Sequence, residues 1–152
     1  MKRFYSNYLL CAFLIFNLFS ANAQDVARYP LIPYPTKLKA GKGAFIINAK
    51  TKIVAASQFK SEAEQLDELL SKGLGTKLVV SKTAGASIKL VYDAAISQPE
   101  GYKLTITPQQ VVIAAAQPAG IFHAIETIRQ LLPVSAEEGV AHKQLSLPAV
   151  SI

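Results

Sequence analysis

The chain has 152 residues, of which 51% are apolar and 17% are charged, and its formal net charge is +6. These values indicate one globular domain and exclude an intrinsically disordered chain. They also exclude a (β/α)8 barrel, which needs roughly 200–250 residues.

Residues 1–23 have the organisation of a cleaved secretory signal peptide. Lys2 and Arg3 precede an almost wholly apolar run from Tyr8 to Phe19, and Ala21-Asn22-Ala23 supplies a small-x-small cleavage site. The apolar run is shorter than the about 20 residues that cross a bilayer, so we expect a leader rather than a membrane anchor. The mature protein is therefore expected to be exported, either periplasmic or secreted, without a membrane span. It loses the single cysteine with the leader, so no disulfide is expected.

The first half of the mature chain reads as an extended segment, two strands and a helix. Residues 28–36 hold three prolines and are expected to be extended. The runs 43–47 and 52–56 are expected to form a hairpin-like pair. A helix is predicted over 59–74 from an apolar stripe at three- and four-residue spacing, with a Ser61–Glu64 capping box and with Gly73 and Gly75 as its end. The stripe consists of Phe59, Ala63, Leu66, Leu70 and Leu74.

The second half reads as four strands, a second helix and a final extended segment. Strands are predicted at 77–82, 87–92, 101–107 and 111–116, and in 101–107 Tyr102, Leu104 and Ile106 are expected on one face. Pro118 opens a helix whose apolar stripe consists of Ile121, Ile125, Ile128 and Leu132, and Pro133 stops it. Residues 134–144 are expected to be a polar loop.

This order of elements predicts an α+β domain with a largely antiparallel sheet and two helices on one face. We expect three parts: the signal peptide at 1–23, the α+β domain at 24–144, and a linker or strand at 145–152 that leads toward a further domain. The lysines are spread along the chain without interleaved aromatic residues, so no nucleic-acid surface is expected.

The acidic and histidine side chains do not form a recognisable catalytic or metal-binding constellation. Asp67-Glu68 lies on the helix face opposite Leu66 and Leu70, so both carboxylates are expected to be solvated. His123 and Glu126 are three positions apart on the second helix and are expected to be a surface pair. His142 and the pair Glu137-Glu138 lie in the following loop. The sequence therefore predicts no catalytic residue, no cofactor and no metal site.

Two further binding motifs can be considered from the residues alone. Gly41-Lys42-Gly43 lacks the spacing and the following helix of a phosphate-binding loop. A free-standing sugar-binding module would need an aromatic lining, whereas Phe45, Phe59 and Phe122 are expected in the core and no tryptophan is present.

Three segments resemble the amino-terminal domain of the family 20 glycoside hydrolases, the β-N-acetylhexosaminidases. Residues 31–36 (LIPYPT) followed by Gly43-Ala44-Phe45 are similar to the family's IPxP opening, and residues 99–106 (PEGYKLTI) to its EGYxLxI strand. Residues 119–133 (AGIFHAIETIRQLLP) match its GxFxAxxTLxQLLP helix, with His123 and Glu126 as departures. Residues 147–152 are similar to the strand that leads into the catalytic barrel.

The resemblance implies an exo-β-N-acetylhexosaminidase that removes terminal β-linked GlcNAc or GalNAc by substrate-assisted hydrolysis. In this mechanism the substrate's 2-acetamido oxygen attacks the anomeric carbon, an Asp orients that group and the adjacent Glu protonates the leaving oxygen. Both acids would lie on the barrel, so the chain is expected to be inactive by itself and to expose an apolar patch where the barrel packs. Asp67-Glu68 is also an Asp-Glu pair, but it does not lie at the position of the family's catalytic pair.

Two alternatives are kept open. The chain is also similar to the equivalent domain of O-GlcNAc hydrolase-type glycosidases, which precedes a different barrel. A stand-alone envelope glycan-binding module belongs to another functional class, and it predicts affinity for chitooligosaccharides without any barrel.

Overall fold

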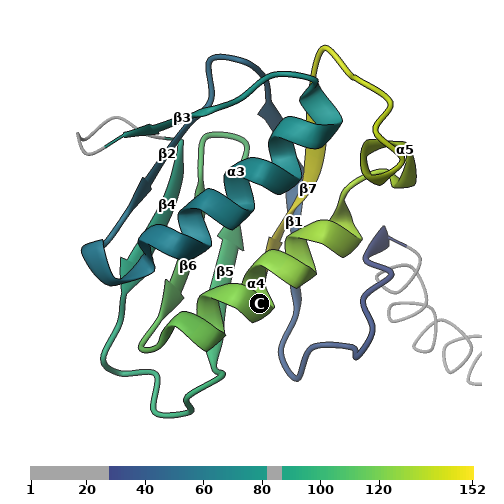
Figure 1. Cartoon of the computed structure of the whole chain (residues 1–152). Coiled ribbons are helices and arrows are strands. Elements are labelled where there is room, and N and C mark those ends of the chain that lie inside the picture. Colours follow the sequence, from purple (N-terminus) through teal and green to yellow (C-terminus); the bar gives the residue numbers. More distant parts are fainter. Residues whose placement is uncertain (1–27, 82–86) are drawn as a thin grey trace, which may run out of the picture. The chain divides into compact units, whose positions relative to one another are not determined.

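The structure, a computed structural model, describes residues 28–81 and 87–152 (Figure 1). The predicted signal peptide, residues 1–23, lies outside the described residues. Residues Leu31–Ile152 cluster as one compact unit apart from the residues before them, and the fold described below as the second unit is that of Leu31–Ile152. Within the described residues, no helix is both long enough and apolar enough to cross a membrane.

The second unit is built on one sheet, which has seven strands within the described residues, in the order β1-β7-β5-β6-β4-β2-β3. The strands are, in chain order, β1 (Lys39–Ile47), β2 (Lys52–Ala55), β3 (Val79–Ser81), β4 (Ile88–Tyr92), β5 (Tyr102–Ile106), β6 (Val111–Ala115) and β7 (Leu145–Ser151). The predicted α+β class is confirmed. The sheet is mixed rather than largely antiparallel, because β2 pairs in parallel with β3 and β4, and β4 in parallel with β6.

The prediction that residues 43–47 and 52–56 form a hairpin is wrong. β1 pairs antiparallel with β7, and β2 lies between β3 and β4. The chain leaves β2, runs through a helix and returns as the parallel neighbour β3, which is the connection that parallel strands require. Residues 145–152 contain the predicted strand, and that strand lies inside the sheet between β1 and β5.

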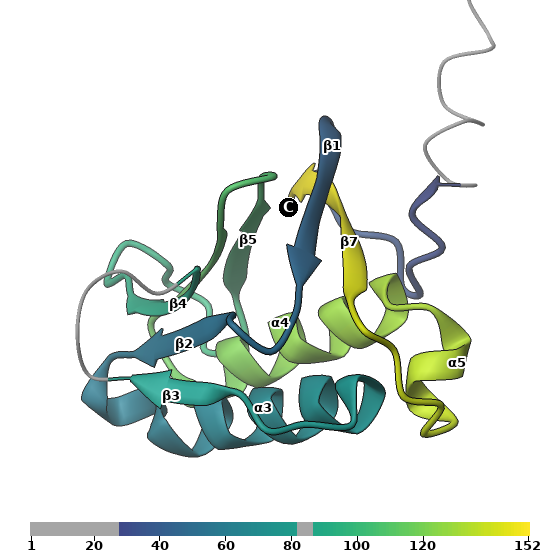
Figure 2. The ribbon, with the colours of Figure 1, turned by 90° about the horizontal axis from the view of Figure 1, so that it is seen from above.

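Both long helices lie on the same face of the sheet, as predicted (Figure 2). They are α3 (Lys60–Leu74), preceded by the short 3-10 helix η2 (Ser57–Phe59), and α4 (Pro118–Leu131). α3 packs on β2, and α4 packs on β5 and β6. The predicted loop 134–144 also contains a one-turn helix, α5 (Val134–Glu137), which was not predicted.

The α3 stripe is buried as predicted, but both of its ends differ in detail. Phe59 is the N-cap and no side chain caps the helix, so the predicted Ser61–Glu64 capping box is absent from the structure. Gly75 ends the helix with a left-handed φ of 66°, as glycine permits at low cost. Gly73 does not end it: this residue is buried inside the helix, where an added Cβ would lie 2.8 Å from the Cβ of Ala136 in α5.

The α4 helix follows the sequence prediction closely. Pro118 is at its first positions, its predicted stripe is buried, and Leu132 caps its C-terminus just before Pro133. The β5 alternation also holds, because Leu104 and Ile106 are buried while Lys103 and Thr105 are exposed. Gly41-Lys42-Gly43 lies in β1 at a register irregularity, so it is part of the sheet.

Candidate functional site

The candidate acidic pair Asp67-Glu68 is divided between two environments. Asp67 Oδ1 accepts hydrogen bonds from Ser71 Oγ at 2.7 Å and from the backbone N–H of Leu78 at 2.9 Å. Asp67 is therefore half-buried and ties α3 to the segment that enters β3, and the prediction that it is solvated is wrong. Glu68 is exposed, as predicted. The two carboxylates do not share a site.

His123 and Glu126 lie at the surface of α4, but each contacts a different partner. His123 Nε2 lies 3.8 Å from Glu100 Oε2, and the Glu126 carboxylate accepts hydrogen bonds from Arg129 Nε at 3.1 Å and Nη2 at 3.3 Å. The surface location is as predicted, and the expected mutual pair is replaced by these two contacts.

His142 has a structural contact. Its Nε2 lies 3.0 Å from Ser135 Oγ, and its backbone N–H donates to the carbonyl of Gly73 at 2.8 Å. These bonds fix residues 134–142 against the end of α3. Across residues 28–81 and 87–152, no group of three or more His, Cys, Asp or Glu side chains could hold a metal ion.

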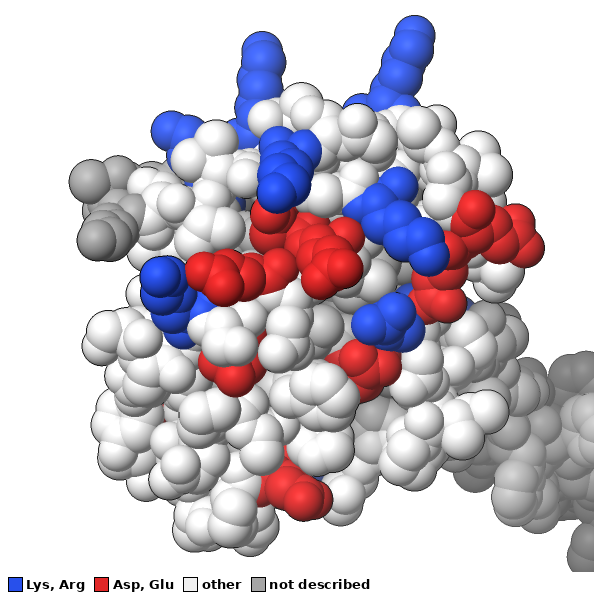
Figure 3. Space-filling model, in the orientation of Figure 1, with Lys and Arg blue, Asp and Glu red and all other residues white. Residues whose placement is uncertain are grey.

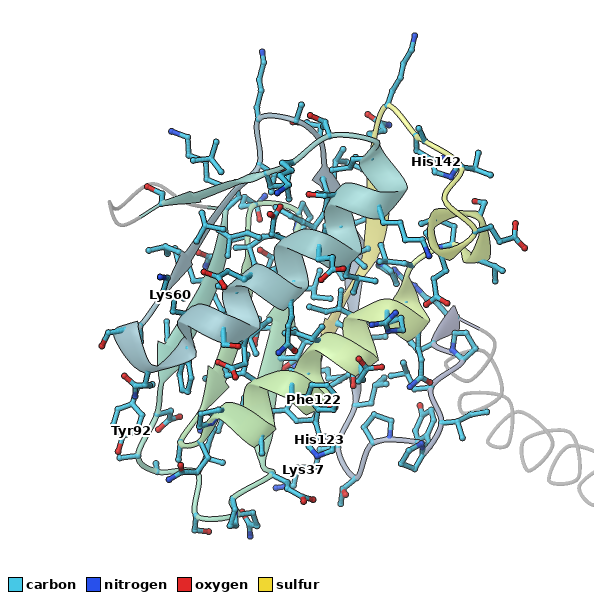
Figure 4. All side chains as sticks on the ribbon, in the orientation of Figure 1. Lys37, Lys60, Tyr92, Phe122, His123 and His142 are labelled. Carbon is cyan, nitrogen blue, oxygen red and sulfur yellow. The ribbon has the colours of Figure 1, made fainter. Side chains whose placement is uncertain are left out.

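One groove brings together the segments that carry the family resemblance. Its volume is about 780 Å³, and it is lined by the Pro-rich segment 31–37, the turn before β5, one face of α4 and Ile152. Each of the four motif segments contributes to this lining. Figure 4 shows Lys37 and His123, two of the lining residues, near Phe122 at the lower edge of α4. We call this feature the groove.

Gly101, which lines the groove, lies in close contact with Gly120 at the start of α4. A Cβ on Gly120 would lie 2.2 Å from the carbonyl oxygen of Gly101 and 2.8 Å from the Cβ of Ala115. Real Cβ atoms do not approach a backbone oxygen so closely, so only glycine fits at position 120 without movement. The glycine of the EGY motif and the first glycine of the helix motif therefore set the distance between β5 and α4.

A second contact joins the same two motifs through hydroxyl groups. Tyr102 Oη and Thr127 Oγ1 are 2.7 Å apart, and Thr127 Oγ1 also lies 3.2 Å from the carbonyl oxygen of His123. A consistent network has Tyr102 donating to Thr127 and Thr127 donating to His123. Thr127 is buried, so this bond satisfies a polar group that would otherwise be costly in the core.

A third contact attaches the Pro-rich segment to α4. The Gln130 side chain accepts from the backbone N–H of Ile32 at 2.7 Å and donates to the carbonyl oxygen of Ile32 at 3.2 Å. Gln130 is the glutamine of the QLLP motif and Ile32 belongs to the IPxP motif. One amide side chain thus holds both polar groups of a single backbone residue 98 positions away.

Large apolar side chains are exposed in and beside the groove. Ile32 is 83% exposed and Tyr34 is 46% exposed. Phe122 is 45% exposed, so the prediction that it lies in the core is wrong, whereas Phe45 and Phe59 are buried as predicted. The Phe122 ring meets the His123 ring edge-on, with centroids 5.6 Å apart. Ile32 and Gln130 were not predicted as site residues, although both belong to motifs that carry the family resemblance.

The outer surface of the helices carries much of the acidic charge (Figure 3). Exposed carboxylates there include Glu64 and Glu68 of α3. At the turn before β5, hydrogen bonds from Lys103 Nζ and the backbone N–H of Ala95 hold the pKa of Asp93 below its ordinary value of 3.8. This aspartate is oriented by its neighbours and lies outside the groove.

The groove has the features of a docking or ligand surface. Its carboxylates, Glu100 and Glu126, each lie next to a basic side chain, and its lining also includes proline, isoleucine and tyrosine side chains. A concave lining that combines exposed apolar side chains with a few polar groups is typical of surfaces that another protein domain or a ligand covers.

The architecture defines an α+β domain with one mixed sheet and two long helices, and comparison with known proteins identifies its family. The family model described as "Glycosyl hydrolase family 20, domain 2" matches residues 28–152. The chain belongs to this family.

A curated relative is the "Beta-hexosaminidase" of Porphyromonas gingivalis, which is 28% identical over 148 residues. The match covers 90% of this chain and 19% of that protein, so the chain spans about a fifth of the length of its relative.

Solved structures share the fold. The N-acetyl-beta-hexosaminidase of Streptomyces plicatus matches with a TM-score of 0.72 and 27% identity, over 82% of this chain and 26% of that one. The GH20 exo beta-N-acetylglucosaminidase of Vibrio harveyi matches with a TM-score of 0.69 and 22% identity, over 82% and 19%. At 22% identity, the similarity to the Vibrio harveyi enzyme shows only that the fold is shared.

Proposed function

We propose that this chain is the non-catalytic accessory domain of an exported exo-β-N-acetylhexosaminidase that removes terminal β-linked GlcNAc or GalNAc. Its membership of the domain 2 family supports this assignment. The names of the Porphyromonas and Streptomyces relatives, both β-hexosaminidases, point to the same activity.

The observation that carries the proposal is the convergence of four motif segments on one groove. Three contacts hold these segments together and form the groove, and they leave apolar side chains exposed. They are the contacts of Gly120 with Gly101, Tyr102 with Thr127, and Gln130 with Ile32. A surface so constructed suits an architectural role beside a larger domain.

The chemistry of the parent enzyme would be substrate-assisted, an exception to hydrolysis by two carboxylates. The substrate's acetamido oxygen attacks the anomeric carbon while an Asp-Glu pair of the catalytic barrel orients that group and protonates the leaving oxygen. The carboxylates described here, including Asp67, Glu100 and Glu126, take no part in that step.

The test is hydrolysis of 4-nitrophenyl N-acetyl-β-glucosaminide. The purified 152-residue chain is expected to release no nitrophenol above the buffer blank, whereas the product of the coding region read past Ile152 is expected to hydrolyse the substrate. Turnover by the 152-residue chain would contradict the non-catalytic assignment. The sequence beyond Ile152 would also separate a family 20 barrel from an O-GlcNAc hydrolase-type barrel.

Export is tested through the leader. We expect signal peptidase to cleave after Ala23, so the mature protein begins at Gln24 and its intact mass is that of residues 24–152. An Ala23→Leu variant places a bulky residue at the cleavage site and is expected to retain the leader. A wild-type protein that keeps residues 1–23 in the cytoplasm would contradict export.

Glycan binding is a second candidate function, favoured by the dimensions and lining of the groove. Its volume of about 780 Å³ lies within the range of small-molecule sites, and Tyr34 offers a half-exposed ring beside amide and carboxylate groups. A calorimetric titration of the 152-residue chain with chitotriose would show heat of binding if this candidate is correct. A flat titration would remove it.

A further inference from the structure

The charges of the domain are divided between its strands and its helices. The strands within the described residues contain five lysines and no aspartate or glutamate, whereas α3, α4 and α5 together contain six carboxylates and three cations. The strand lysines are Lys39, Lys42, Lys52, Lys89 and Lys103. The helices therefore carry a net negative charge, as the view of Figure 3 indicates, and the strands carry a net positive charge.

Strand alternation places three of these lysines on the face of the sheet opposite the helices. Successive side chains of a strand point to opposite faces. Lys52, Lys89 and Lys103 each precede a residue of the buried core in their strand, and that core lies between the sheet and the helices that pack on it. We call the opposite face, which no helix of the described residues covers, the open face (Figure 2).

One row of side chains crosses the whole open face, because residues paired across neighbouring strands share a face. The row consists of Lys39, Ser151, Thr105, Val112, Lys89, Val54 and Ser81. It holds two ammonium groups, three hydroxyl groups and no carboxylate. At the usual spacing of strands, Lys39 and Lys89 are about 19 Å apart, and Lys52, on the strand next to Lys89, lies about 8 Å from it.

The positive charge of the open face is only partly neutralised. Lys103 Nζ lies 3.0 Å from Asp93 Oδ2, whereas Lys89 Nζ donates to Gln110 Oε1 at 3.0 Å, and an amide leaves its charge in place. None of the ion pairs between described residues involves Lys39 or Lys52. The fields of Lys52 and Lys89 add, because the two groups are separated by about one Debye length at physiological salt.

The layout of these charges favours an extended anionic partner. A single anion cannot contact lysines about 19 Å apart, whereas a chain with repeated negative groups can. A second copy of the open face would place lysines against lysines, which is unfavourable. Val54 and Val112, the apolar members of the row, are short and partly buried, so they offer little to insert into a bilayer. The row also lacks the arginine and aromatic side chains on which nucleic-acid bases stack.

We propose that the open face binds an anionic glycan, a chain whose sugars carry carboxylate or sulfate groups. Lys39, Lys52 and Lys89 meet these acidic groups, and the hydroxyl groups of Ser151 and Thr105 donate hydrogen bonds to sugar oxygens. The three lysines lie outside the groove. This inference deepens the proposed function, because it assigns acidic groups to the N-acetylhexosamine glycan of the parent enzyme, and it rests on that function for the choice of a glycan.

The test is binding of a chondroitin sulfate oligosaccharide, in which a uronate alternates with a sulfated N-acetylgalactosamine, followed by fluorescence anisotropy. The 152-residue chain should bind it, and the double variant Lys39→Gln/Lys52→Gln should bind on the order of tenfold more weakly. Lys60→Gln/Lys72→Gln is the matched control, because it removes the same charge from α3 on the helix side of the sheet. It should change the dissociation constant by less than about twofold.

The alternatives to an open-face glycan site give different results. Equal weakening by the two double variants would show that only net charge matters and would overturn the inference. Tighter binding to vesicles of phosphatidylglycerol and phosphatidylcholine than to the oligosaccharide, lost in Lys39→Gln/Lys52→Gln, would overturn it in favour of a lipid surface. Circular dichroism of both variants should match wild type, since each change replaces a surface lysine with a polar side chain of similar length.

Failure of the inference and failure of the proposed function are distinguishable. Hydrolysis of the nitrophenyl substrate by the product read past Ile152, with no binding of chondroitin sulfate, would overturn the inference and leave the proposed function standing. Binding by the 152-residue chain without hydrolysis by the longer product would count against the proposed function alone, and the open face would remain a site for anionic glycans.

Discussion

α3 and α4 cover the same face of the same sheet, yet different contacts hold them there. α3 packs through a stripe of buried side chains and makes few specific polar contacts outside its C-terminal half. α4 is held by a glycine contact, a hydroxyl pair and an amide bridge. Both helices bury an apolar stripe, and α4 adds contacts that depend on particular atoms, so α4 is expected to be the less tolerant of substitution.

The largest difference is expected between two glycine substitutions. Gly120→Ala places a Cβ against the carbonyl oxygen of Gly101, and we expect it to lower the free energy of unfolding by about 3 kcal/mol or more. Gly73→Ala in α3 places a Cβ against Ala136 of the short helix α5, which lowers the free energy of unfolding. Alanine is favoured over glycine inside a helix by about 1 kcal/mol, which offsets part of this loss. Urea denaturation of both variants measures the two losses in free energy of unfolding, and equal losses would contradict the prediction.

The next effect concerns the polar contact of α3. Asp67→Ala removes the acceptor of the backbone N–H of Leu78, and Leu78 is only 6% exposed. Because that buried donor loses its partner, the substitution should lower the free energy of unfolding by about 2 kcal/mol. Glu68→Ala, one position along on the exposed face, is the control and should stay within about 0.5 kcal/mol of wild type. If the two variants unfold at the same urea concentration, Asp67 has no structural role.

A smaller effect is expected from the hydroxyl pair of α4. Tyr102→Phe and Thr127→Val each remove one hydroxyl of the 2.7 Å contact, and each should cost about 1 kcal/mol. The double variant should cost less than the sum of the two, since the second substitution removes a group that has already lost its partner. Denaturation of all four proteins gives the coupling energy, and strict additivity would show that the hydroxyls act independently.

The smallest effect is a dependence of stability on pH, away from both helices. The pKa of Asp93 is held below 3.8 by Lys103 and Ala95. Its contribution to stability is therefore present above pH 3.8 and is lost as the pH falls through the lowered pKa of the folded state. In thermal unfolding measured from pH 5 to pH 2, Asp93→Asn should make the melting temperature fall less steeply as the pH is lowered. An unchanged dependence of the melting temperature on pH would contradict the prediction.

The sequence predicted the helices well because their signals are local. Apolar spacing, Pro118 and Gly75 act over a few residues, and each is found where it was expected. The strand pairing was predicted less well, since nothing near residues 43–47 indicates that their partner lies at 145–148. Local order suggested the hairpin that the structure does not contain.

The groove could not be predicted for the same reason. It depends on contacts between segments that are far apart in the chain, such as Gln130 with Ile32 and Gly120 with Gly101. Two single residues also differ from the prediction. Asp67 lies on the polar face of α3 but meets the backbone of Leu78, and Phe122 is an aromatic residue in an apolar helix yet faces solvent. The family motifs contained most of the lining residues, without indicating that they meet.

The pairing of β1 with β7 has a consequence for synthesis of the protein. β1 is made near the beginning of the domain, and its partner Leu145–Ser151 is made about a hundred residues later. At 5–20 residues per second, translation separates the two strands by on the order of 5–20 s. During that time β1 has no neighbour in the sheet, and its buried residues Phe45 and Ile47 have no final position. A chain interrupted shortly before Leu145 would therefore leave an unpaired strand available to chaperones or to aggregation.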